Sequence, residues 1–431
     1  MKNYIKNSKV AKNSMWIIAD RIFQMVISLI IGSLTARYLG PTNYGIINYG
    51  ASIIALFLSI AKLGLENIII KEYVDNRNKN GEIIGTAMIL RLCASFISIL
   101  LIFILITILK PNEEIIIVVT MLQSLSLIFQ SYEIIDYWFQ SNLQSKYTSI
   151  AKSIAYTIVA IYKIVLLLLG KPVEWFALAT TLDYFIIFIF LYIVYKKKST
   201  QKLFFSKSIL KGLLSKSYHF IISGMLVTLY TQMDKIMIGE FLGSSQVGFY
   251  SSAVTICTLW GFIPDALLNS FRPVIYELKS KNEKEYANKL KLLYFIVFWL
   301  GIVFATIVSI FSKFIINILF GSAYISAQVT LMIAVWYTAF AYLGSARNIW
   351  FISENKIKYS KKCVIFGALS NLILNYILIP IYGINGAAVA TLISQIIVAL
   401  IAPLFYKEIR ISTKIMLEGI FLKNNLLKLK K

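Results

Sequence analysis

Histidine and cysteine are scarce in this sequence of 431 residues, which contains one histidine, His219, and three cysteines. A single histidine cannot supply a His-based acid–base pair. The sequence also has no Gly-x-Ser-x-Gly elbow, His-Glu-x-x-His pair or Gly-rich phosphate-binding loop. Cys93, Cys257 and Cys363 all fall inside apolar runs, which argues against disulfides and thiolate metal sites. We therefore predict that the protein is not an enzyme and has no catalytic residues.

Charged residues are also few, at 15% of the chain, whereas 58% of the residues are hydrophobic and the mean hydropathy is +0.74. Soluble domains contain about 25% charged residues. The composition therefore predicts an integral membrane protein whose outer surface contacts the lipid bilayer. The net charge of +23 does not indicate nucleic-acid binding, because the basic residues cluster between apolar runs, as in cytoplasmic loops.

The apolar runs predict an all-α protein of about twelve transmembrane helices, because one membrane span needs roughly 20 apolar residues. The predicted spans are 14–39, 44–64, 83–109, 114–138, 147–169, 173–195, 216–239, 248–273, 290–317, 327–350, 359–382 and 384–406.

The distribution of lysine and arginine predicts the orientation of these spans. With a cytoplasmic N-terminus, most of the 43 Lys and Arg residues fall in cytoplasmic connections and termini, and the outward loops are short. We therefore expect both termini in the cytoplasm. The first apolar run is too long for the core of a cleavable signal peptide.

The longest basic connection divides the spans into two groups of six. The predicted parts are an N-terminal lobe at 14–195, a basic cytoplasmic linker at 196–215, a C-terminal lobe at 216–406 and a basic cytoplasmic tail at 407–431. The tail and a second basic stretch, 277–291, either lie on the anionic inner leaflet or form solvated loops.

A short repeat suggests that the two lobes are duplicates. Leu39-Gly40 is followed four residues later by Gly45, and Leu242-Gly243 is followed in the same way by Gly248. Each copy lies between the first two spans of its lobe, where glycine permits a tight turn. Duplicated halves are common in transporters.

Charged side chains inside the spans are costly and usually face a bundle interior or a wet cavity. The predicted headgroup-binding cations of such a cavity between the lobes are Arg21, Lys62, Arg91, Lys163, Lys235 and Arg272. Their predicted internal acidic partners are Asp20, Asp183 and Asp265. Structural ion pairs between helices, and side chains that reach the inner interface, remain alternative interpretations.

Three stretches resemble bacterial polysaccharide flippases of the multidrug/oligosaccharidyl-lipid/polysaccharide exporter superfamily. They are Ala36–Gly45, Met233–Gly239 running on to Tyr250, and Asn371–Thr391. The resemblance spans essentially the whole chain and implies a MATE-like, V-shaped fold of two six-helix lobes in the bacterial inner membrane. It implies alternating access for an undecaprenyl-pyrophosphate-linked oligosaccharide that feeds O-antigen, capsule or another surface glycan. Partners would include the polymerase and chain-length proteins of that pathway.

The resemblance also implies an ion site. Related lipid II flippases bind sodium through an acidic residue of helix seven, two polar residues of helix eleven and a threonine of helix twelve. The matching residues here are Asp234, Asn371, Asn375 and Thr391. Asn375 stands where that relative has a carboxylate, so sodium coupling, proton coupling and a purely structural hydrogen-bond cluster all remain open.

Two other functions remain open at this point. A cation-coupled multidrug antiporter would share the fold, but the cations inside the spans do not favour cationic drugs. A membrane glycan polymerase or acyltransferase usually presents its chemistry on a large outward loop, which the predicted topology lacks.

Overall fold

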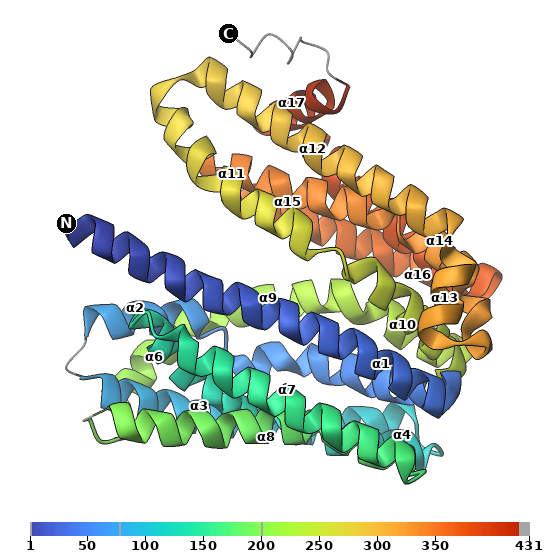
Figure 1. Cartoon of the computed structure of the whole chain (residues 1–431). Helices are drawn as coiled ribbons and strands as arrows, with labels where there is room; N and C mark the ends of the chain where they lie inside the picture. The colour runs from blue at the N-terminus through green and yellow to red at the C-terminus, as the bar shows by residue number, and fades with distance from the viewer. Residues whose placement is uncertain (1, 77–78, 200, 422–431) are drawn as a thin grey trace. The chain divides into compact units, whose positions relative to one another are not determined.

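The computed structural model describes residues 2–76, 79–199 and 201–421, and these form helices and turns without any strand (Figure 1). Contacts divide the chain into two compact units, Met1–Thr228 and Leu229–Lys431. The predicted all-α class is confirmed. Each unit is described below by itself.

In the first unit, α1 packs against α3, α4 and α7, and α8 packs against α4 and α7 (Figure 1). The helices are α1 (Lys2–Lys62), α2 (Glu66–Asp75), α3 (Asn80–Leu109), α4 (Glu114–Ser124), α5 (Ser126–Phe129), α6 (Glu133–Ser141), α7 (Ser145–Leu168), α8 (Val173–Lys198) and the first part of α9 (Lys207–Leu242), with a 3-10 turn at Gln130–Tyr132.

In the second unit, α12 packs against α11, α15 and α17, and α16 packs against α14 and α15. The helices are α10 (Ser244–Thr258), α11 (Phe262–Lys281), α12 (Glu283–Ile310), α13 (Ser312–Phe320), α14 (Gln328–Ala334), α15 (Tyr337–Ser353), α16 (Ile357–Ile396) and α17 (Arg410–Ile420). A 3-10 stretch at Ser322–Ala327, a π-helical turn at Ile397–Ile401 and a 3-10 turn at Ala402–Phe405 complete it.

Seven of the described helices are long and apolar enough to cross a membrane, or nine if each of two bent helix pairs counts as one span. Two of the seven, Met15–Lys62 and Ile357–Phe405, contain 48 and 49 residues, about twice the length of one span. Each is interrupted by a glycine with non-helical dihedral angles, Gly40 or Gly383, and so has room for two crossings. The predicted seventh span lies inside α9. The elements therefore agree with about twelve crossings.

The outer surface of these helices is apolar. On α3, Phe96, Leu100 and Phe103 are 60%, 59% and 46% exposed. Burying such side chains is worth about 1.5–3 kcal/mol each, so a water-soluble protein would not leave a row of them exposed. Lipid is the solvent that suits this surface, and the chain is a multi-pass membrane protein.

The predicted Leu-Gly turn is present in both units. Gly40 has φ 70° and ψ 173°, and Gly243 has φ 86° and ψ 175°. A positive φ is strained for residues with a Cβ and is readily adopted by glycine. The two copies of the repeat therefore have the same backbone conformation as well as the same residues.

The connection between α8 and α9 is shorter than the predicted linker. Helix α8 continues to Lys198 and α9 begins at Lys207, so most of the predicted stretch 196–215 is helical. The contact division falls later, at Thr228 within α9, because the first part of this helix packs on the first unit. There the hydroxyls of Ser59 and Thr228 lie 3.5 Å apart.

The predicted tail includes α17, which packs along α12 of its own unit. The Trp299 indole N–H donates to the Ile420 carbonyl over 3.1 Å, and Lys291 pairs with Glu418 over 2.7 Å. Residues 422–431 of the predicted tail lie outside the described residues.

Candidate functional site

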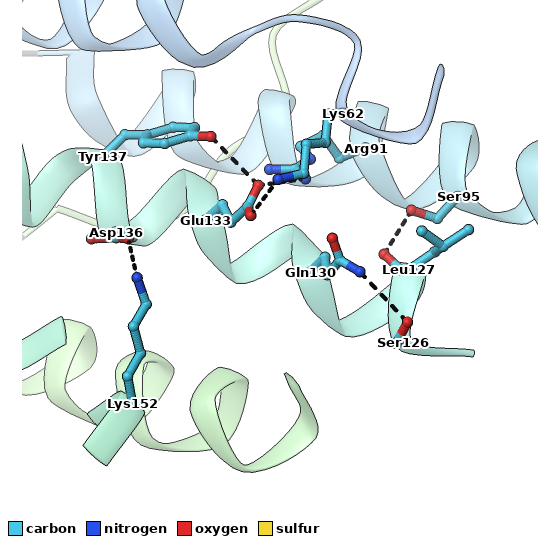
Figure 2. A network of polar contacts seen from close by, with 10 residues as sticks. All are labelled: Lys62, Arg91, Ser95, Ser126, Leu127, Gln130, Glu133, Asp136, Tyr137 and Lys152. Atoms are coloured by element: carbon cyan, nitrogen blue, oxygen red, sulfur yellow. Dashed lines mark hydrogen bonds and ion pairs between the residues drawn. The ribbon is translucent and has the colours of Figure 1, made fainter. Parts of the chain in front are cut away.

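In the first unit, Glu133 binds two of the cations predicted for the headgroup. Lys62 Nζ lies 2.7 Å from Glu133 Oε1, and Arg91 Nη2 lies 3.0 Å from Glu133 Oε2. The Tyr137 hydroxyl donates to the same carboxylate over 3.4 Å (Figure 2). Arg91 is only 2% exposed, and a buried guanidinium requires such a partner. Glu133 was not among the predicted site residues, although it falls inside the predicted span 114–138.

The pairing places the two cations differently. Arg91 is buried against Glu133 and ties α3 to α6, and its predicted part in a headgroup site stays a prediction. Lys62 shares the same carboxylate, and its side chain is 34% exposed. The group of three charges keeps one net positive charge.

A cavity of about 310 Å³, which we call the polar cavity, is lined by residues of α1, α2, α6 and α7. Two of the predicted residues, Asp20 and Arg21, line it. Gln24 Nε2 donates to Asp20 Oδ2 over 2.7 Å. Also in its lining, Lys152 Nζ lies 3.3 Å from Asp136 Oδ2 (Figure 2). The lining therefore combines one ion pair with a carboxylate that accepts from an amide.

A second cavity of about 330 Å³ adjoins the first, because Gln24 lines both. It is bounded by α1, α7 and α8 and contains Lys163 and Asp183, which were predicted as a cation and its acidic partner. The structure brings the two residues to one cavity. Among the described residues, the Asp183 Oδ1 atom has no hydrogen-bond partner, so this carboxylate has capacity for a donor from a guest molecule.

The remaining predicted charges belong to the second unit and do not cluster. Lys235 is partly buried in α9, whereas Asp265 and Arg272 are exposed on α11. Their predicted part in a headgroup site stays a prediction.

Arg347 in α15 is a further buried cation, and its contacts are structural. It is 2% exposed and donates to the carbonyls of Val398 and Ala399 over 2.6 and 2.5 Å. Both carbonyls belong to the π-helical turn, where the regular i to i−4 hydrogen-bond pattern is interrupted. The guanidinium satisfies backbone acceptors that the lipid could not satisfy.

The four residues of the predicted ion site come together in the second unit. Asn375 Nδ2 donates to Asp234 Oδ1 over 2.6 Å and to Asn371 Oδ1 over 3.1 Å. The Thr391 hydroxyl donates to Asp234 Oδ2 over 2.5 Å, and Asn371 Nδ2 donates to Thr391 over 3.4 Å. A fifth member, Tyr250, also donates to Asp234 Oδ2 over 2.5 Å. We call these five residues the Asp234 cluster.

The Asp234 cluster fits a small monovalent cation better than a divalent metal. Its oxygens carry one formal negative charge, and such oxygen ligands suit hard cations. The Asn375 Oδ1 atom has no hydrogen-bond partner among the described residues, although Asn375 is fully buried. Within the described ranges, no group of three or more His, Cys, Asp and Glu residues is placed to hold a metal ion.

The chain matches a family described as "Polysaccharide biosynthesis protein" over residues 10–264, and a family described as "MatE" over residues 220–377. A Haloferax volcanii protein named a low-salt glycan biosynthesis flippase, Agl15, is 28% identical over 195 residues, 43% of this chain and 39% of that protein. The uncharacterized membrane protein MJ1068 of Methanocaldococcus jannaschii is 28% identical over 210 residues, 47% of this chain and 41% of that protein. The matched region thus spans less than half the length of these two relatives.

A Shigella flexneri protein named an O-antigen transporter is matched more fully, at 22% identity over 92% of this chain and 97% of that protein. Among solved structures, the lipid II flippase MurJ in an inward closed conformation has a TM-score of 0.68 and 17% identity, covering 95% of this chain and 91% of that chain. An inward-facing multidrug resistance MATE family transporter has a TM-score of 0.64 and 16% identity, covering 95% and 96%. These likenesses show a shared fold.

Proposed function

Because the chain belongs to the polysaccharide biosynthesis protein family, we propose that it is a flippase for undecaprenyl-pyrophosphate-linked oligosaccharide repeat units. The proposed location is the bacterial inner membrane, with both termini in the cytoplasm, in a pathway that makes O-antigen, capsule or another surface polysaccharide. A polymerase and chain-length proteins would then act on the product.

The observation that carries this proposal is the pair of adjoining cavities, both with charged side chains in their lining, inside a helix bundle with an apolar outer surface. Moving a sugar hydroxyl into hydrocarbon without a partner costs about 4–8 kcal/mol. A flippase therefore has to supply polar groups along the route of the headgroup while the lipid tail stays in the bilayer. The first unit contains such groups at Asp20, Gln24, Lys163 and Asp183.

We propose that Lys163 provides headgroup attraction in the first unit and that Arg91 does not. Lys163 lines an open cavity, whereas Arg91 is buried against Glu133. An ammonium group acts on phosphate as a point charge and needs no fixed bidentate geometry. Lys62 would add charge on the same unit, whereas Arg21 lines the polar cavity beside Asp20.

We further propose that the Asp234 cluster couples transport to sodium or to protons. A bound cation would neutralise the Asp234 carboxylate, which joins α9 to α10 and α16 through Tyr250, Asn375 and Thr391. The chain's own residues supply the carboxylate, two amide oxygens and a hydroxyl for this purpose. Without a cation, the donors of the cluster compensate the same charge.

A reconstituted transport assay tests the proposed function. Lipid-linked oligosaccharides extracted from a producing strain that lacks this protein are placed in proteoliposomes, and their appearance on the opposite leaflet is followed by glycosidase accessibility. We expect faster movement than in protein-free liposomes, and slower movement with Lys163→Ala. The matched control is Lys171→Ala, which removes an exposed lysine outside the two cavities. Movement no faster than in protein-free liposomes would contradict the proposal.

The match to the MatE family favours a second candidate, a cation-coupled multidrug antiporter. The same vesicles distinguish the two functions when they are loaded with ethidium and given a sodium or proton gradient. Ethidium movement without oligosaccharide movement would select the antiporter.

A further inference from the structure

The polar cavity carries more acidic than basic side chains. Asp20, Glu66 and Asp136 line it together with the two cations Arg21 and Lys152. Asp20 and Asp136 are 8% and 5% exposed, so these carboxylates are largely removed from water. With all five groups ionised the cavity has one net negative charge. Pyrophosphate, which carries several negative charges, is therefore repelled from this site and belongs elsewhere on the protein.

The uncharged groups of the polar cavity are suited to hydroxyl groups. The Gln140 side chain offers two N–H donors and one oxygen acceptor, and the Asp oxygens accept. Gln24 donates one N–H to Asp20, which leaves its second N–H and its oxygen. Each hydroxyl of a sugar both donates and accepts, so it needs both kinds of partner side by side. The carboxylates, amides and cations of this one lining provide both kinds of partner.

Thr148 is independent evidence that the polar cavity is a binding site for a polar ligand. Its side chain lines the cavity and is 3% exposed, and its hydroxyl oxygen finds no hydrogen-bond partner among the described residues. A buried hydroxyl without a partner costs about 1–3 kcal/mol. A polar guest molecule in the cavity would remove that cost.

We propose that the polar cavity binds a neutral sugar ring of the lipid-linked oligosaccharide, apart from the pyrophosphate. This assignment rests on the proposed flippase function. The volume of about 310 Å³ lies at the lower end of the range of about 300–1,000 Å³ typical of small-molecule sites. Gln24 also lines the adjoining cavity, so a longer oligosaccharide continues from one cavity into the next.

The experiment places a reactive thiol in the cavity of the full-length protein. Thr148→Cys is combined with Cys93→Ala, which removes the exposed native cysteine, since Cys257 and Cys363 are buried. The rate of modification by a small methanethiosulfonate is measured with two probes in turn. One is the lipid-linked oligosaccharide fraction of the producing strain, and the other is undecaprenyl pyrophosphate without sugar. Ser149→Cys provides a second position in the same lining if the first variant does not fold.

We expect the oligosaccharide-bearing lipid to slow modification at least about fivefold and undecaprenyl pyrophosphate to leave the rate unchanged. Equal protection by both lipids would assign the cavity to the headgroup and overturn the proposal. Absence of protection, although the oligosaccharide-bearing lipid raises the melting temperature of the protein, would show that the sugar binds elsewhere. If neither lipid binds at all, the proposed flippase function fails as well.

A pair of glutamine variants supplies a second readout. Gln140→Leu removes one amide from the cavity and is expected to weaken binding of the oligosaccharide-bearing lipid about two- to tenfold, as the loss of one or two hydrogen bonds predicts. Gln144→Leu is the matched control, because Gln144 lies four residues away, is exposed and does not line the cavity. Binding of undecaprenyl pyrophosphate should be the same in both variants. A loss of its binding in Gln140→Leu would contradict the assignment.

Discussion

The Asn375 side-chain nitrogen lies 2.6 Å from Asp234 Oδ1 and joins α16 to α9 through a fully buried hydrogen bond. A carboxylate at position 375 could not donate this bond and would face Asp234 with a like charge. Two carboxylates in one buried site cannot both ionise unless a cation lies between them. The asparagine therefore lets the Asp234 cluster remain intact without a cation. We expect a cation at this site to bind more weakly than it would beside two carboxylates.

The first prediction follows from this contact. Asn375→Asp is expected to make the protein less stable without sodium and to increase the stabilisation by sodium, because a cation then neutralises two carboxylates. The measurement is the melting temperature in sodium chloride and in choline chloride of equal ionic strength. Wild-type protein should respond to sodium much less than the variant. The same melting temperature in both salts for Asn375→Asp would contradict the assignment of a cation site.

A second prediction concerns Glu133. Glu133→Gln leaves Arg91 and Lys62 without their carboxylate, and an unpaired buried charge costs about 3–5 kcal/mol. We expect a strong loss of folded protein in detergent and a lower melting temperature. The control is Glu277→Gln, which breaks the exposed pair with Lys281, a type of pair worth about 0–1 kcal/mol. Equal melting temperatures for the two variants would show that Glu133 does not stabilise the first unit.

Hydropathy and glycine spacing predicted the helices well. A long apolar run must be helical in lipid, whichever other helices pack against it. Each span can therefore be predicted from its own stretch of sequence. The Leu-Gly repeat likewise fixes a local backbone angle, and both Gly40 and Gly243 have it. By contrast, the pairing of charges depends on the rotation and depth of separate helices, which sequence alone does not specify.

The missed residues illustrate this limit. Glu133 lies 42 residues from Arg91 and 71 residues from Lys62, so no helical periodicity connects them. Its only sequence signal was a carboxylate inside an apolar span. Tyr250 ended one of the stretches that resemble the family, and its contact with Asp234 depends on how α10 packs against α9. The other four residues of the Asp234 cluster were found through the family resemblance and not through their spacing.

The third prediction is that Lys163 is needed for transport, whereas Arg91 is needed for the stability of the folded protein. Lys163→Ala is expected to reduce export of surface glycan severalfold while the amount of protein in the membrane stays normal, because Lys163 lines a cavity. Arg91→Ala is expected to reduce the amount of folded protein, because it leaves Glu133 with Lys62 alone. Surface glycan and membrane protein are quantified in the same cells. If Arg91→Ala accumulates normally and only export fails, the structural role of Arg91 is wrong.

The fourth prediction concerns the short connection between α8 and α9, which runs along the start of α3. The Gly81 N–H donates to Gln201 Oε1 over 2.7 Å, and the Ser206 N–H donates to Thr86 Oγ1 over 2.8 Å. A Cβ atom at Gly85 would lie 2.5 Å from the Phe204 carbonyl oxygen, a distance at which the backbone has to move. Gly85→Ala should therefore displace the connection from α3.

Limited trypsin digestion measures that displacement, because Lys196, Lys197 and Lys198 precede the connection and Lys202 lies within it. We expect cleavage there to be several times faster in Gly85→Ala than in the wild type, with the rest of the digestion pattern unchanged. Gly212→Ala is the matched control, because a Cβ atom on Gly212 meets no described atom within 4 Å, and alanine favours the helical state of α9 by about 1 kcal/mol. Cleavage at the wild-type rate in Gly85→Ala would mean that the connection does not depend on its close approach to α3.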